Sequence, residues 1–121
     1  MILGLRSAIV PAPDLAAAKA WYAQVFETQP YFDEPFYVGF NIGGFELGLI
    51  PDGCPSTEGV SALWGVADIA EEHARILAIG ATELDAVKDV GGGIKASALR
   101  DPFGNCLGLI ENPQFDPRAI R

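Results

Sequence analysis

The chain has 121 residues, of which 50% are apolar and 20% are charged, and this composition is typical of one globular domain. Sixteen Asp and Glu against eight Lys and Arg give a formal net charge of −8, which argues against binding to nucleic acid or an anionic membrane. No apolar run approaches the roughly 20 residues of a transmembrane helix. The two cysteines are too few for a disulfide framework and the first residues lack a secretory signal, so we expect a cytoplasmic protein.

The first half of the sequence predicts a strand, a helix and three further strands. An alternating segment rich in β-formers ends at Pro11, and Asp14 is a good N-cap for a helix that runs to about Phe26. Gly43 and Gly44 supply the positive φ angles that a two-residue hairpin turn requires. The strands that we expect after the helix cover residues 31–32, 36–42 and 45–50.

The second half repeats this order after a polar linker rich in Gly and Pro, residues 51–59. Asp68 is the expected N-cap of a second helix, and Gly80 is the expected residue after its last turn. The sequence DPFGN at 101–105 favours a turn before the final strand. The predicted strands of this half cover residues 60–66, 83–90, 94–99 and 106–111.

An internal repeat supports this division into halves. Residues 7–16 (SAIVPAPDLA) align without a gap with residues 61–70 (SALWGVADIA). Further along, LGLI occurs at 47–50 and again at 107–110. A period near half the chain indicates two copies of one supersecondary module, and two copies can close around a shared cavity.

The repeat therefore predicts the fold class. We expect an α+β protein in which two tandem β-α-β-β-β modules form a curved, eight-stranded mixed sheet around a cleft, with the helices on the outer face. The modules are expected at residues 1–52 and 60–113 of a single domain, followed by a C-terminal tail at 114–121.

Several short motifs carry a resemblance to a known family. They are PDL at 13–15 with Trp21 and Tyr22 in the following helix, VADI at 66–69, GA at 80–81 and, most specifically, DPFGN at 101–105 with LIENP at 109–113. On these motifs the chain resembles the vicinal oxygen chelate superfamily, which includes glyoxalase I, extradiol dioxygenases and the bleomycin-resistance proteins. The resemblance implies paired β-α-β-β-β modules, a cleft between them and a homodimer.

The same resemblance directs attention to four positions. Metal-dependent members of the superfamily place a ligand, commonly His, Glu or Gln, on the first and the last strand of each module. Matched onto this sequence, those positions hold Ser7, Gly48, Ser61 and Gly108. Glycine has no side chain to offer and serine is a poor neutral ligand, so we expect no metal ion and no other cofactor. Glu111 lies past Gly108 on the opposite face of its strand, so we interpret it as a structural contact.

Strand alternation selects the side chains that share a face with these four positions. The glycines either leave volume for a ligand or permit close strand packing. Glu46 is the candidate general base, because a carboxylate facing an apolar cleft suits that role; the alternative is a cross-strand pair with Asn41 at a wet rim. The predicted lining of the cleft is Ser7, Ile9, Tyr37, Asn41, Glu46, Gly48, Ser61, Leu63, Arg100, Cys106 and Gly108.

The other reactive side chains are given structural roles. His73, the single histidine, is expected on the second helix, behind the sheet from the cleft, in a partly buried position. Cys106 would need a cation or a base nearby to act as a nucleophile. The predicted arrangement contains no Cys/His pair and no Ser/His/Asp set.

Three functions fit these observations. The first is metal-independent binding of a small molecule, with a cationic drug as one candidate because the chain is acidic. The second is a glyoxalase-like lyase or isomerase that acts on a small carbonyl compound with Glu46 as base. The third is an accessory domain that keeps the fold without a ligand. The residues at the four ligand positions favour the first function.

Overall fold

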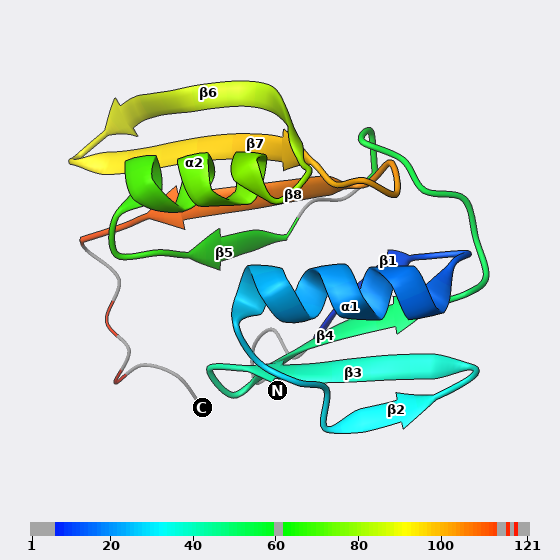
Figure 1. The fold of residues 1–121 in the computed structure, drawn as a ribbon. Helices are drawn as coiled ribbons and strands as arrows, with labels where there is room; N and C mark the ends of the chain where they lie inside the picture. Colours follow the sequence, from blue (N-terminus) through cyan, green and yellow to red (C-terminus); the bar gives the residue numbers. More distant parts are fainter. Residues whose placement is uncertain (1–6, 60–61, 114–115, 117, 119–121) are drawn as a thin grey trace. The chain divides into compact units, whose positions relative to one another are not determined.

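The structure is a computed structural model that describes residues 7–59, 62–113, 116 and 118 (Figure 1). The chain divides into two compact units after Pro55. Each unit contains one helix and one four-stranded mixed sheet, in the order β-α-β-β-β. The predicted α+β class and tandem modules are therefore confirmed. Within the described ranges, neither helix is long and apolar enough to cross a membrane.

In the first unit the strand order is β1-β4-β3-β2, with β1 parallel to β4 and the other neighbours antiparallel. One face of this sheet packs against the helix: Val38, Phe40, Leu47 and Leu49 are all at most 1% exposed. The elements are β1 (Ser7–Pro11), α1 (Leu15–Phe26), β2 (Phe32–Glu34), β3 (Tyr37–Ile42) and β4 (Phe45–Ile50).

Helix α1 begins and ends at residues with a clear local cause. The Asp14 side chain accepts a hydrogen bond from the Ala17 amide at 3.1 Å, which satisfies a donor in the first turn. At the other end Glu27 adopts a left-handed conformation with φ 55°, and its amide donates to the Ala23 carbonyl. Between these caps Ala18, Trp21, Tyr22 and Val25 are buried. The predicted helix is thus confirmed.

The hairpin of β3 and β4 has the predicted register. Gly43 and Gly44 have φ angles of 60° and 93°, and the two-residue turn pairs Ile42 with Phe45. Further along the ladder, Asn41 lies opposite Glu46 and Gly39 lies opposite Gly48.

The strands of the preceding hairpin, β2 and β3, begin and end at other residues than the sequence predicts. Its first strand runs from Phe32 to Glu34 rather than over residues 31–32, and β3 begins at Tyr37 rather than at 36. Glu34 pairs with Tyr37, so Pro35 and Phe36 form the turn between the two strands. Proline suits this place because its fixed φ favours a turn and it has no amide hydrogen for a strand ladder.

The second unit repeats the first. Its strand order is β5-β8-β7-β6, with β5 parallel to β8. Leu63 pairs with Gly108 just as Ile9 pairs with Gly48 in the first unit. Residues 60–61, where the predicted strand 60–66 begins, lie outside the described residues. The elements are β5 (Leu63–Gly65), α2 (Ile69–Ala78), β6 (Thr82–Gly91), β7 (Ile94–Arg100) and β8 (Cys106–Glu111).

The start of α2 is held by two carboxylates. The Asp68 side chain accepts from the Glu71 amide at 3.1 Å, and Oε1 of Glu111, at the end of β8, accepts from the Ile69 amide at 3.0 Å. Both satisfy amide donors that a helix start leaves without intrahelical partners. Glu111 is therefore a structural contact, as predicted. Gly80 follows the helix with φ 118°.

The DPFGN turn is built around a buried aspartate. Oδ1 of Asp101 accepts from the amides of Phe103 and Asn105, at 2.9 and 2.8 Å. The Asn105 side chain in turn accepts from the Ser56 amide at 3.0 Å, which fastens the linker to this turn. Asp101 is 3% exposed and Asn105 is 5% exposed. The motif that carries the resemblance most strongly is thus a structural device of the second unit.

Candidate functional site

The face of the first sheet that points away from α1 carries most of its polar side chains. We call this the helix-distal face; strand alternation and register assign to it Ser7, Ile9, Tyr37, Gly39, Asn41, Glu46 and Gly48. In particular, Ser7 lies beside Glu46 and Ile9 lies beside Gly48 on the parallel strands β1 and β4. The predicted cleft residues of the first half therefore do share one face.

Glu46 is the centre of a hydrogen-bonded cluster on this face. Its Oε1 accepts from the Tyr31 hydroxyl, and its Oε2 accepts from the Tyr37 hydroxyl at 2.5 Å. Tyr31 precedes β2, and its amide donates to the Gly39 carbonyl at 2.9 Å, which positions its side chain near Glu46. We call Tyr31, Tyr37 and Glu46 the tyrosine–glutamate cluster.

The cluster replaces the predicted pair of Glu46 with Asn41. The two residues are opposite each other in the ladder, as predicted, but the Asn41 side chain accepts from the Gly44 amide at 3.0 Å and so belongs to the turn. The partners of Glu46 are instead two phenols, of which one comes from before β2 and the other from the start of β3. Tyr31 was not among the predicted residues because its approach depends on a loop.

Both phenols of the cluster are held in the neutral form. Burial, followed by the hydrogen bond to Glu46 and the negative charge of Glu46, raises the pKa of Tyr37 to about 12. The hydrogen bond to Glu46 is the main cause that raises the pKa of Tyr31. At neutral pH the cluster thus consists of two protonated donors around one carboxylate.

Two glycines opposite each other make room for this cluster. A Cβ at Gly48 would collide with the Tyr37 hydroxyl and would lie 2.7 Å from Cζ of the same ring. A Cβ at Gly39 would lie 3.1 Å from Oε1 of Glu46 and 3.3 Å from each tyrosine ring. The space beside these two glycines is therefore taken by the side chains of Tyr31, Tyr37 and Glu46.

Exposed aromatic rings continue the face beyond the cluster. Phe32 is 39% exposed, and Tyr31 and Phe36 are each 66% exposed. The Phe32 ring centroid lies 6.0 Å from that of Tyr37 and 6.1 Å from that of Phe36, in edge-on geometry. We call Tyr31, Phe32, Phe36 and Tyr37 the aromatic edge. Of these four residues, only Tyr37 was in the predicted lining of the cleft. Phe32, Glu34 and Phe36 stand at alternate positions, and this spacing was the signal in the sequence that could have placed Phe32 and Phe36 on one face.

The second sheet has an equivalent face with different side chains. Gly108 lies beside Leu63 and opposite Ala98, and Cys106 lies opposite Arg100, which gives the predicted register of Arg100 and Ala98. A Cβ at Gly108 would be 2.7 Å from Cδ2 of Leu63 and 3.0 Å from the Ala62 carbonyl oxygen. The Cys106 thiol is free and half-buried. Ser61 lies outside the described residues, and a single cleft lined by both units stays a prediction.

A chain of Ser97, His73 and Glu83, of which the first two are buried, appears where the sequence predicted no such set. His73 on α2 is 5% exposed; its Nδ1 is 2.9 Å from Oγ of Ser97, and its Nε2 is 2.7 Å from Oε1 of Glu83. Ser97 is 4% exposed and lies among the core of the second unit, so a substrate has no access to its hydroxyl. The chain ties α2 to β6 and β7, which keeps the predicted structural role of His73.

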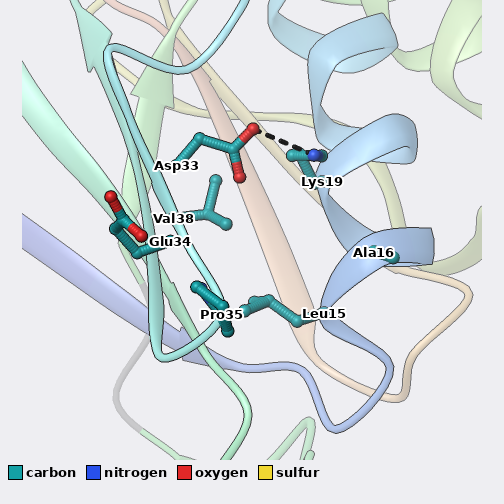
Figure 2. Close-up of a pocket in the computed structure, with 7 residues that line it drawn as sticks. All are labelled: Leu15, Ala16, Lys19, Asp33, Glu34, Pro35 and Val38. Carbon is teal, nitrogen blue, oxygen red and sulfur yellow. Dashed lines mark hydrogen bonds and ion pairs between the residues drawn. The ribbon is translucent and has the colours of Figure 1, made fainter.

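A separate pocket of about 440 Å³ lies in the first unit on the α1 side of the sheet (Figure 2). Lys19 on α1 and Asp33 on β2 form an ion pair across it, with 2.9 Å between Nζ and Oδ2. The Glu34 carboxylate points away from this pair. Its lining residues are Leu15, Ala16, Lys19, Asp33, Glu34, Pro35 and Val38.

The residues present do not fit the metal site that the resemblance implies. Side chains at Gly48 and Gly108 would overlap Tyr37 and Leu63, so neither position has room for a ligand unless its neighbour moves. In the part of the chain that the structure describes, no group of three His, Cys, Asp or Glu residues is arranged to hold a metal ion. We therefore derive no chemistry through a metal.

The comparisons with known proteins agree with the fold. A family model described as a glyoxalase-like domain matches residues 7–110, so the chain belongs to the glyoxalase-like domain family. No curated protein gave a significant match. The predicted superfamily is thereby confirmed.

Three solved structures illustrate the likeness. A lactoylglutathione lyase from Agrobacterium tumefaciens has a TM-score of 0.77 at 20% identity, over 96% of this chain and 100% of its own. A glyoxalase-related enzyme from Fulvimarina pelagi has a TM-score of 0.75 at 18% identity, over 93% and 90%. A bleomycin resistance determinant encoded on the transposon Tn5 has a TM-score of 0.72 at 23% identity, over 91% and 98%. At these identities the likeness shows the fold.

Proposed function

We propose that the protein binds a small organic molecule without a metal ion, with the helix-distal face of the first sheet as part of the site. The observation that carries this proposal is the packing of Tyr37 across Gly48. One of the positions that metal-dependent relatives use for a ligand is here covered by a phenol, which is itself hydrogen-bonded to Glu46. A bleomycin resistance determinant shares the fold, and this supports binding as a function that the fold can serve.

The same geometry weakens the alternative in which Glu46 is a general base. A general base must approach a substrate proton within hydrogen-bond distance. Each oxygen of Glu46 already accepts a hydrogen bond from a tyrosine, and these donors would have to move or share the oxygen. We therefore assign Glu46 to recognition of the ligand rather than to proton abstraction.

Two further parts of the proposal concern the setting of the protein. We propose a homodimer, which rests on the resemblance, and sedimentation that shows a monomer at micromolar concentration would contradict it. We propose a cytoplasmic location, which the two free thiols, Cys54 and Cys106, support.

The binding function is tested by a thermal-shift screen with a panel of small organic compounds that includes bleomycin. A specific ligand raises the melting temperature in proportion to the logarithm of its concentration once the site is saturated. We expect at least one such compound, with the same shift before and after dialysis against a metal chelator. A shift that chelation abolishes would contradict metal independence, and a panel without any shift would favour the accessory domain.

A further inference from the structure

The aromatic edge is a surface that the first unit does not need for its own core. Apart from Ala12, the buried apolar side chains of this unit lie on α1 and on the face of the sheet that packs against α1. Phe36 occupies a turn and is 66% exposed, and Phe32 lies on a three-residue edge strand. Clustered exposed rings are characteristic of binding surfaces.

Among residues 7–55, acidic residues outnumber basic ones by six to one. Lys19 is the one basic residue in positions 7–55, and it is paired with Asp33 on the α1 side of the sheet (Figure 2). Glu34 pairs with Tyr37 in the β2–β3 ladder and so belongs to the same face as the aromatic edge. The acidic residues in this range are Asp14, Glu27, Asp33, Glu34, Glu46 and Asp52.

Glu46 keeps the capacity to bind a charged donor. A carboxylate has about four acceptor positions, two on each oxygen. The two tyrosines use one on each oxygen and donate as neutral phenols, so the net charge of the cluster is that of the carboxylate. A positive centre without an N–H can be attracted by this charge while both phenols keep their hydrogen bonds to Glu46.

Aromatic faces reinforce the same preference. The electron-rich face of a Phe or Tyr ring attracts a cation within about 6 Å, and aromatic cages for alkylammonium groups use this attraction. The Phe32 ring lies within ring contact of both Phe36 and Tyr37, and Tyr37 reaches Glu46. Tyr37 thus links the rings to the carboxylate, because it contacts Phe32 on one side and Glu46 on the other.

We propose that the aromatic edge and Glu46 together bind an organic cation, with an alkylammonium group against the rings and its charge facing the Glu46 carboxylate. This inference rests on the proposed function and gives the chemical class of the ligand. An uncharged aromatic compound gains only the ring contacts, and an anion is repelled by Glu34 and Glu46.

The experiment is a nuclear magnetic resonance titration of the ¹⁵N-labelled chain. The probe is benzyltrimethylammonium, compared with benzyl alcohol as a neutral compound and benzenesulfonate as an anion. We expect saturable shifts of the Phe32, Gly39 and Gly48 amides with the cation, and affinities for the other two probes that are lower by a factor of about 5 or more. Added salt should weaken binding of the cation.

Variants separate the charge from the rings. Glu46→Gln should weaken binding of benzyltrimethylammonium by a factor of about 5 or more, and Phe36→Ala by about 3. Asp52→Asn, which removes one exposed charge from the same unit, should leave the affinity unchanged. Phe36 is exposed in a turn, so its replacement keeps the test available if Glu46→Gln fails to fold.

The outcomes distinguish this inference from the proposed function. Equal binding of the cation and benzyl alcohol, or wild-type affinity in both Glu46→Gln and Phe36→Ala, would overturn the cation site and leave metal-independent binding intact. Binding of the cation that is lost after chelation would contradict the proposed function instead. An absence of shifts at the three amides with all probes would overturn the cation site.

Discussion

Tyr37 lies across Gly48, and the space where a Cβ of residue 48 would stand is filled by the phenol that is hydrogen-bonded to Glu46. This relationship explains why residue 48 of β4 is a glycine: any side chain there would have to displace the Tyr37 ring. Gly39 lies directly opposite in the ladder, and a Cβ there would lie 3.1 Å from Oε1 of Glu46.

Gly48→Ala should destabilise the protein by about 1–3 kcal/mol, because the added methyl group forces the Tyr37 ring aside in a packed region. Urea denaturation measures the change. Gly59→Ala is the matched control, since a Cβ there meets nothing within 4 Å. Equal stability of the two variants would show that Tyr37 does not occupy this space.

Tyr37 should ionise well above the pKa of 10.0 of an ordinary phenol. Its pKa is raised from 10.0 to about 12, so the neutral phenol is favoured in the folded state. The stability that it contributes is fully present below pH 10 and is lost as the pH rises toward 12. Alkaline titration of tyrosinate absorbance should show this late step, and Tyr37→Phe should remove it. If Tyr37→Phe removed an absorbance step near pH 10 instead, the raised pKa of Tyr37, and with it the tyrosine–glutamate cluster, would be contradicted.

His73→Ala should destabilise the second unit by about 2 kcal/mol, because it leaves a cavity and removes the partner of the buried Ser97 hydroxyl. Glu83→Gln should cost less than about 1 kcal/mol, since the Glu83 side chain is 48% exposed. Chemical denaturation of both variants provides the comparison. If Glu83→Gln proved the more harmful, the buried Ser97–His73 contact would not be the main link.

Asp101→Ala should destabilise by about 2 kcal/mol, because the amides of Phe103 and Asn105 lose a shared buried acceptor. Asp89→Ala is the control: Asp89 accepts from the Gly91 amide in an exposed turn, where water can replace it. Amide hydrogen exchange at Phe103 and Asn105 should accelerate only in Asp101→Ala. Unchanged exchange there would place the stabilisation of the turn elsewhere.

Local signals account for what the sequence could predict. Asp14 and Asp68 begin the helices through hydrogen bonds within one turn, and Gly43 with Gly44 sets the hairpin register through backbone conformation alone. Register then places Glu46 and Gly48 on one face without knowledge of the rest of the fold. These inferences need only a few consecutive residues each.

Contacts between distant residues account for what could not be predicted. The direction of the Tyr37 ring decides whether Gly48 borders free volume or a packed side chain, and no pattern in β4 reports it. The approach of Tyr31 to Glu46 depends on a loop before β2. The hydrogen bond between His73 and Ser97 joins α2 to β7, and the whole of β6 lies between these two elements in the sequence.

Metal binding by the intact chain tests the central claim most directly. The purified protein would be dialysed to equilibrium against Zn²⁺, Ni²⁺, Mn²⁺ or Fe²⁺ in turn, and the bound metal measured per chain. We expect far less than one ion per chain for each metal, because Tyr37 and Leu63 occupy the space of the missing side chains. One tightly bound ion per chain of any of these metals would contradict the account.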